Sequence, residues 1–135
     1  SDSAIALTTK NAKRLEVSDY TVIKSDLFDK IDKRYDMILS NPPYIESKVI
    51  DGLMPEVRDY EPRLALDGDA DGLKFYRAII ENAESYLNEK GYILFEIGNH
   101  QAHDVQQLLV DKHFEDVRVV KDLAENDRVV IGRKA

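Results

Sequence analysis

Apolar side chains recur every three or four residues in three stretches of the chain, the spacing expected for one face of a helix. The pattern predicts helices over residues 4–15, 73–90 and 101–112. Asp71 precedes the second of these stretches. It is a suitable cap, because its carboxylate can accept hydrogen bonds from the free N–H groups of a first helical turn.

Shorter stretches that are mostly apolar or rich in β-branched residues predict strands. We expect five strands, over residues 21–24, 35–40, 92–97, 117–121 and 128–133. Strands alternate with helices until the last two, which are joined by a short polar turn and should form a hairpin. This order predicts an α/β fold with a doubly wound, mostly parallel sheet that contains one antiparallel strand.

The 46–68 segment shows no clear periodicity and contains Pro55 and Pro62. We therefore predict a long loop at this place. Loops of such length are uncommon inside a compact domain and usually carry function.

The 135 residues include 26 acidic and 19 basic side chains, a formal net charge of −7, with no basic run. This charge argues against direct nucleic-acid binding, which depends on clustered Lys and Arg side chains. No stretch is long and apolar enough to suggest a membrane span, and no secretory signal pattern is present. Without cysteines, and with histidines that share no ligand spacing, the chain suggests no metal site, and we expect a cytoplasmic protein.

The most informative motif is the 41–44 turn, made of Asn41, Pro42, Pro43 and Tyr44 directly after the predicted strand over residues 35–40. In open α/β sheets, ligands bind at this end of the strands. The side-chain carbonyl of Asn41 and the main-chain carbonyl of Pro42 can both accept protons from one substrate –NH2 group. The fixed φ of proline restricts where these carbonyls point, and Tyr44 offers a flat face to an amide or a base. The same residues would also suit a plain proline turn with a surface tyrosine.

This turn resembles the catalytic motif of S-adenosylmethionine-dependent methyltransferases that act on planar nitrogens. Other segments make the resemblance narrower and are similar to the PrmC/HemK family, whose members methylate a glutamine side-chain amide in peptide-chain release factors. These segments are residues 60–66, 71–73, 96–98, 122–124 and 127–130. The resemblance extends from residue 4 to residue 134 and implies the Rossmann-like class I methyltransferase fold.

The resemblance assigns the substrate to the 41–44 turn. Asn41 and Pro42 would hold the glutamine amide, while Pro43 and Tyr44 would complete the binding site around the side chain. Asn41, Pro42 and Tyr44 are accordingly the expected catalytic residues.

The resemblance also implies a binding site for S-adenosylmethionine. Asp26 and Leu27, after the predicted strand over residues 21–24, would contact the adenine, and Asn41 would lie close to the same cofactor. The alternative is that Asp26 caps a loop and Leu27 belongs to the core. Glu96, at the end of another predicted strand, is either a second acid near the substrate or an ordinary strand-end carboxylate.

Compared with the family pattern, the chain lacks the first two strands and the glycine-rich cofactor loop, since its six glycines are scattered. We therefore expect residues 1–135 to be a partial catalytic domain, inactive alone and without tight cofactor binding. The loss of these strands would leave strand edges unpaired. Residues 1–30 could then leave the position that they have in the family, or they could exchange with those of a second copy of the chain and give a strand-exchanged dimer.

Three functions compete. The first is a protein-glutamine methyltransferase with a release factor as its protein substrate. The second is a DNA or RNA base amino-group methyltransferase, which would use the same clamp on a flipped base. The third is a non-catalytic fragment or binding module.

Overall fold

The computed structural model describes residues 1–135, which divide into two compact units, Ser1–Asp32 and Lys33–Ala135. The first unit contains a single helix, α1 (Asp2–Arg14), in which no side chain is buried. The hydroxyl of Ser1 accepts a hydrogen bond from the N–H of Ala4 at 3.3 Å and so caps this helix. The rest of the unit is irregular chain and turns.

The strand predicted over residues 21–24 is wrong, because this segment forms no strand. A strand needs a neighbour for its backbone N–H and C=O groups. The four strands of the structure all belong to the second unit, and none of them pairs with residues 21–24. Apolar composition alone was therefore not sufficient to form a strand here.

The second unit is built on a four-stranded sheet. Its strands are β1 (Tyr35–Ser40), β2 (Leu87–Glu96), β3 (Glu115–Lys121) and β4 (Asp127–Arg133), in the order β1-β2-β4-β3. The pair β1 and β2 is parallel, whereas β4 runs antiparallel to both of its neighbours. The predicted mostly parallel sheet with one antiparallel strand is thus confirmed, and so is the terminal hairpin.

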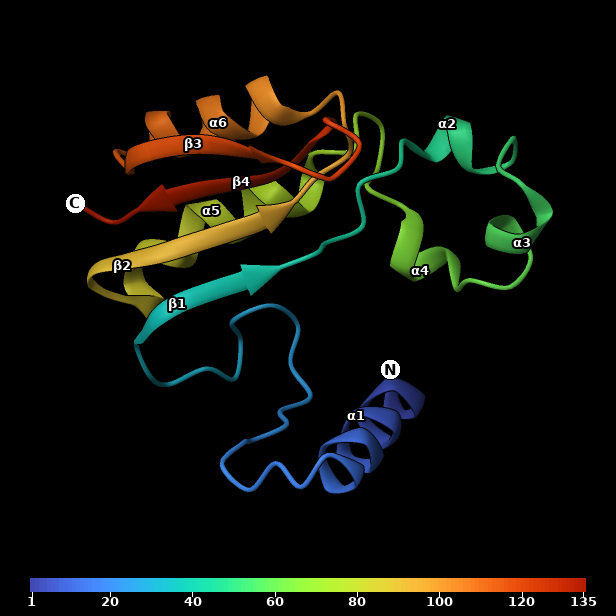
Figure 1. Cartoon of the computed structure of the whole chain (residues 1–135), viewed down its shortest axis with the longest axis horizontal. Coiled ribbons are helices and arrows are strands. Elements are labelled where there is room, and N and C mark those ends of the chain that lie inside the picture. Colours follow the sequence, from blue (N-terminus) through green and yellow to red (C-terminus); the bar gives the residue numbers. More distant parts are fainter. The chain divides into compact units, whose positions relative to one another are not determined.

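Two helices, α5 (Lys74–Tyr86) and α6 (Ala102–Asp111), pack against the sheet on the same side (Figure 1). The doubly wound arrangement predicted from the sequence, with helices on both faces, is therefore not formed within this unit. The ring of Tyr76 in α5 meets that of Phe95 in β2 edge to face, with centroids 5.3 Å apart. Fully buried side chains of the helices and the sheet make the core, among them Tyr76, Ala83, Leu87, Ile93, Phe95, Ile97, Val105, Leu109 and Val130.

The helix predicted over residues 73–90 ends earlier than expected, at Tyr86. Leu87 already has extended backbone angles, φ −102° and ψ 140°, and its side chain is fully buried. It also pairs with Tyr35 at the start of β1. Pairing with a neighbouring strand outweighs the helical periodicity at residues 87–90, which form the beginning of β2.

The 46–68 segment is more ordered than the predicted loop. It contains three single-turn helices, α2 (Ser47–Ile50), α3 (Pro55–Arg58) and α4 (Arg63–Leu66). Both prolines stand at helix starts, where a missing N–H is harmless. Hydrogen bonds from the N–H of Ile45 to the carbonyl of Leu66 (2.9 Å) and from the N–H of Gly68 to the carbonyl of Ile45 (2.8 Å) hold the two ends of the segment together.

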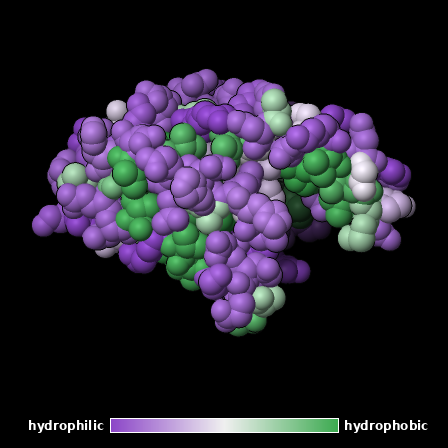
Figure 2. Space-filling model, turned by 90° about the horizontal axis from the view of Figure 1, so that it is seen from above, coloured by the Kyte–Doolittle hydropathy of each residue, from purple (hydrophilic) through white to green (hydrophobic).

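Exposed apolar side chains gather in two parts of the second unit. Figure 2 shows hydrophobic surface on the lobe that α2, α3 and α4 form, where Met54 and Leu64 are exposed. The other part is β1, an edge strand that pairs with β2 alone and exposes Tyr35, Met37 and Leu39. Strand exchange at this edge stays a prediction. None of the helices combines the length and the apolar character needed to cross a membrane.

Candidate active site

The parallel pairing of β1 and β2 brings two predicted site residues to one edge of the sheet. Asn41 follows the last residue of β1, and Glu96 is the last residue of β2. Both line a pocket of about 330 Å³ together with Leu39, Ser40, Leu94 and Val129. Leu39 is paired with Leu94, and Glu96 with Val129, so these side chains stand on the same face of the sheet. Asn41 and Glu96 thus share one pocket, and their roles in it stay predictions.

The 41–44 turn leaves the sheet beside this pocket. Asn41 is exposed, Pro42 is buried, and Pro43 and Tyr44 are half-buried, with every peptide bond trans. The side-chain amide of Asn41 makes no hydrogen bond within the chain. An exposed amide at the carboxyl end of a parallel strand is available to bind a ligand.

Charged and hydroxyl groups surround the end of β2. The hydroxyl of the buried Tyr76 donates to the main-chain carbonyl oxygen of Glu96 at 2.8 Å. Burial, and then the nearby Tyr44 and Glu96, raise the pKa of this hydroxyl above its usual value, so it stays protonated. The guanidinium of Arg128 donates a hydrogen bond of 3.1 Å to the carbonyl of Ile97, the residue after Glu96.

Arg128 is a site residue that the sequence did not point to. Its guanidinium forms an ion pair with Asp122 at 3.1 Å, and hydrogen bonding to that carboxylate raises the pKa of Arg128. Tyr44 and Glu96 contribute less to the same upward shift of the pKa. Asp122, in the turn between β3 and β4, thereby holds the guanidinium of Arg128 at the end of β2.

Gln101, just before α6, was also missed. Its side chain joins the 41–44 turn to the start of α5 and to the loop after β2. The one sequence signal was its position, a polar residue three places after Gly98 in a loop at the carboxyl end of a strand.

Comparisons with known proteins show which sequences resemble this chain. The family described as "Methyltransferase small domain" matches residues 1–56. A release factor glutamine methyltransferase of Fusobacterium nucleatum is 46% identical over 99% of this chain, and one of Geobacter sulfurreducens is 45% identical over 98%. The similarity to release factor glutamine methyltransferases thus extends over nearly the whole chain. The chain spans 38% and 47% of the lengths of these two relatives.

Solved structures agree on the fold. A methyltransferase from Pyrococcus furiosus superposes with a TM-score of 0.66 and 16% identity, covering 100% of this chain and 59% of that one. A ribosomal protein L11 methylase from Lactobacillus delbrueckii subsp. bulgaricus gives 0.63 with 20% identity, covering 100% of this chain and 55% of that one. The predicted class I methyltransferase fold is confirmed.

The predicted adenine-binding residues lie in the other unit, Ser1–Asp32. Asp26 and Leu27 form part of a turn in which the carbonyl of Asp26 accepts a hydrogen bond from the N–H of Asp29 at 3.0 Å. Leu27 has a left-handed backbone with φ 43° and an exposed side chain. Their role beside Asn41 stays a prediction. The alternative of a buried core leucine does not fit the exposure of Leu27.

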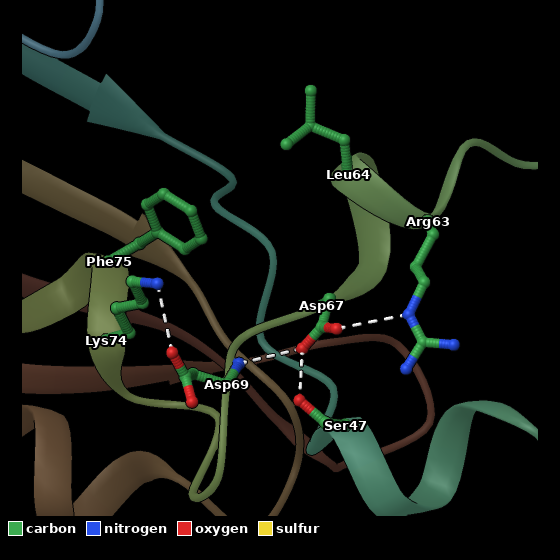
Figure 3. A pocket seen from close by; sticks show the side chains of 7 residues that line it. All are labelled: Ser47, Arg63, Leu64, Asp67, Asp69, Lys74 and Phe75. Carbon is green, nitrogen blue, oxygen red and sulfur yellow. Dashed lines mark hydrogen bonds and ion pairs between the residues drawn. The ribbon is translucent and has the colours of Figure 1, made fainter.

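A second pocket, of about 410 Å³, lies next to the 46–68 segment (Figure 3). Asp67 stands at its centre and accepts hydrogen bonds from the hydroxyl of Ser47 (2.5 Å), the N–H of Asp69 (2.9 Å) and the guanidinium of Arg63 (3.3 Å). These bonds, that of Ser47 first, lower the pKa of Asp67. Since Ser47 begins α2 and Arg63 begins α4, Asp67 ties the lobe together.

Proposed function

We propose that the protein transfers a methyl group from S-adenosylmethionine to the side-chain amide of a glutamine in a peptide-chain release factor. The observation that carries the proposal is the exposed, unpartnered amide of Asn41 in a pocket at the carboxyl edge of β1 and β2. The names of the relatives, 45% and 46% identical, support the choice of substrate.

The difficulty of this reaction is the substrate nitrogen. An amide nitrogen is a poor nucleophile, because its lone pair is delocalised into the carbonyl group. If the carbonyl oxygens of Asn41 and Pro42 accept its two N–H protons, the lone pair is directed toward the methyl carbon, and positive charge that develops on nitrogen is stabilised. The nitrogen–carbon bond forms as the carbon–sulfur bond breaks, the electron pair leaves with sulfur, and the nitrogen then loses a proton to solvent.

The residues of the pocket fit the cofactor that this reaction requires. S-adenosylmethionine supplies an activated methyl group and carries a flat aromatic ring system beside polar amino, hydroxyl and carboxylate groups. Leu39 and Leu94 give the pocket an apolar wall, and Ser40, Asn41 and Glu96 give it polar groups. We propose that Asp26 and Leu27 bind the adenine and that Asn41 lies between cofactor and substrate.

The test compares the chain with a chimera in which it replaces the matching segment of the Geobacter sulfurreducens relative. Transfer of radioactive methyl to purified release factor is measured. We expect activity from the chimera and not from the chain alone, which carries no glycine-rich cofactor loop. Asn41→Ala should lower the rate of the chimera roughly a hundred- to a thousandfold, the loss typical for one preorganised polar partner.

The matched control is Asn82→Ala, because Asn82 is exposed on α5 and bonds only within its own helix. A cooperatively folded chimera that transfers no methyl to release factor overturns the proposal, as does an active Asn41→Ala variant. Transfer to DNA or RNA instead of release factor would establish the base methyltransferase alternative.

A further inference from the structure

One side chain makes three hydrogen bonds that reach three different loops. The Nε2 amide of Gln101 donates to the carbonyl oxygens of Tyr44 (3.1 Å) and Gly72 (3.3 Å). Its Oε1 accepts from the N–H of Gly98 at 3.0 Å. All three bonds are partly buried, where competition from water is reduced.

The chain around Gln101 approaches so closely that Gly68 and Gly72 have no room for a side chain and Gly98 has little. A Cβ at Gly68 would come within 2.8 Å of the Cα of Tyr44, and one at Gly72 within 2.8 Å of the Nε2 of Gln101. A Cβ at Gly98 would lie 3.0 Å from the Oε1 of Gln101 and 3.4 Å from the Tyr44 ring. The last residue of the 41–44 turn is thus enclosed by glycine backbone on several sides.

The arrangement requires a primary amide. Glutamine has two N–H donors and one carbonyl acceptor on the same group, and here two carbonyls and one N–H face it. An ionised glutamate at this position would turn an oxygen toward the two carbonyl oxygens, and an asparagine would be one methylene too short. The identity of the side chain, and not merely its size, is therefore determined by its partners.

We propose that Gln101 is a positioning residue that holds the 41–44 turn in the geometry needed for methyl transfer. The inference rests on the proposed function. Gln101 bonds to Tyr44 at one end of the turn, and buried Pro42 and strand β1 fix the other end. The carbonyl of Pro42 and the side chain of Asn41 are then held by a turn anchored on both sides, so their direction is set before the substrate arrives.

The kinetic test uses the chimera described above, with Gln101→Glu and the control Gln107→Glu. Gln107 lies on α6, is exposed to solvent, and its side chain bonds only to Asp111. Misplaced reacting groups commonly cost up to about a hundredfold in rate. We expect Gln101→Glu to lower kcat about ten- to a hundredfold, with KM for release factor within about twofold, and Gln107→Glu to leave both unchanged.

A pH profile separates positioning from general damage. When the carboxyl group introduced by Gln101→Glu is protonated, it regains one O–H donor for the carbonyl of Tyr44. The ratio of variant to wild-type kcat should therefore rise as the pH falls. A variant with wild-type kcat overturns the proposal, and so does a kcat deficit that is the same at every pH.

Hydrogen exchange on the chain itself tests the same inference without any activity. Gln101→Ala should accelerate exchange of the amides of Gly98, Ile45 and Gly68, since the first loses its acceptor and the other two depend on the anchored turn. Gln107→Ala should not. Unchanged exchange at Ile45 and Gly68 overturns the positioning role. If Gln101→Ala accelerates exchange but the wild-type chimera is inactive, the result would support the anchoring role of Gln101 and refute the methyltransferase function.

Discussion

The hydroxyl of Tyr76, in α5, donates a hydrogen bond of 2.8 Å to the main-chain carbonyl oxygen of Glu96, the last residue of β2. Tyr76 is fully buried and its ring packs edge to face on Phe95. The helix thereby supports the point at which β2 ends and Glu96 enters the pocket. The hydrogen bond of Tyr76 thus connects the hydrophobic core to the wall of the pocket.

This relationship predicts a loss of stability for Tyr76→Phe. The variant keeps the ring packing but leaves a carbonyl without its donor, which costs about 1–3 kcal/mol in a buried place. Urea unfolding of the chain, followed by circular dichroism, measures the difference. Tyr60→Phe, which changes an exposed hydroxyl, is the control and should unfold as wild type does. Equal midpoints for Tyr76→Phe and wild type would show that the hydrogen bond contributes nothing.

Gly72→Ala should destabilise the turn region. Gly72 has φ +72°, and an added Cβ would collide with the carbonyl oxygen of Tyr44. The left-handed backbone alone costs an L-residue about 1–2 kcal/mol, so a larger total is expected in thermal or urea unfolding. At Gly52 the nearest atom is a carbonyl oxygen 3.5 Å away, and Gly52→Ala should be neutral or slightly stabilising. Similar effects of the two substitutions would contradict the close packing.

The lowered pKa of Asp71 predicts that the stability of the protein depends on pH. The Asp71 carboxylate accepts from the N–H of Leu73, the residue before α5, and forms an ion pair with Arg77. The predicted cap is wrong, because Leu73 occupies the N-cap position and no side chain caps the first turn of α5. The hydrogen bond from Arg77, and then that from Leu73, lower the pKa of Asp71 from 3.8 to about 2. A carboxyl with a lowered folded-state pKa adds stability above its unfolded pKa and loses it as the pH falls through the folded value.

Asp71→Asn should therefore be less stable than wild type above about pH 4, and the difference should vanish between about pH 4 and about pH 2. Both partners are 50% exposed, so solvent limits the effect to about 1 kcal/mol or less. Urea unfolding at a series of pH values measures it, and Arg77→Gln in the same series provides a double-mutant cycle. A difference as large at pH 2 as above pH 4 would exclude the charge as its cause.

Substitutions at Tyr44 separate its ring from its hydroxyl. If the ring packs against the substrate side chain, Tyr44→Phe should keep most of the methyl transfer activity of the chimera, and Tyr44→Ala should lose it. Rates on release factor measure both. Phenylalanine as damaging as alanine would instead assign a chemical role to the hydroxyl.

The part of the site that could be predicted follows from local order along the chain. Asn41 comes directly after an apolar strand and Glu96 ends another, and parallel strands place both at one edge of the sheet. Gln101 could not be found in this way, because 57 residues separate it from Tyr44. Its partners are main-chain carbonyl and N–H groups, which every sequence contains and which only a folded backbone brings to one place.

The elements themselves show the same division. Apolar periodicity and the motif after β1 determined the α/β order, the hairpin and the position of the 41–44 turn, because these depend on neighbours in the sequence. Tertiary structure decided that residues 21–24 form no strand, that α5 ends at Tyr86, and that Gly68, Gly72 and Gly98 close around Tyr44. Strand pairing and close backbone contact join residues that are distant in the chain, and their free energy outweighs local preference wherever the two disagree.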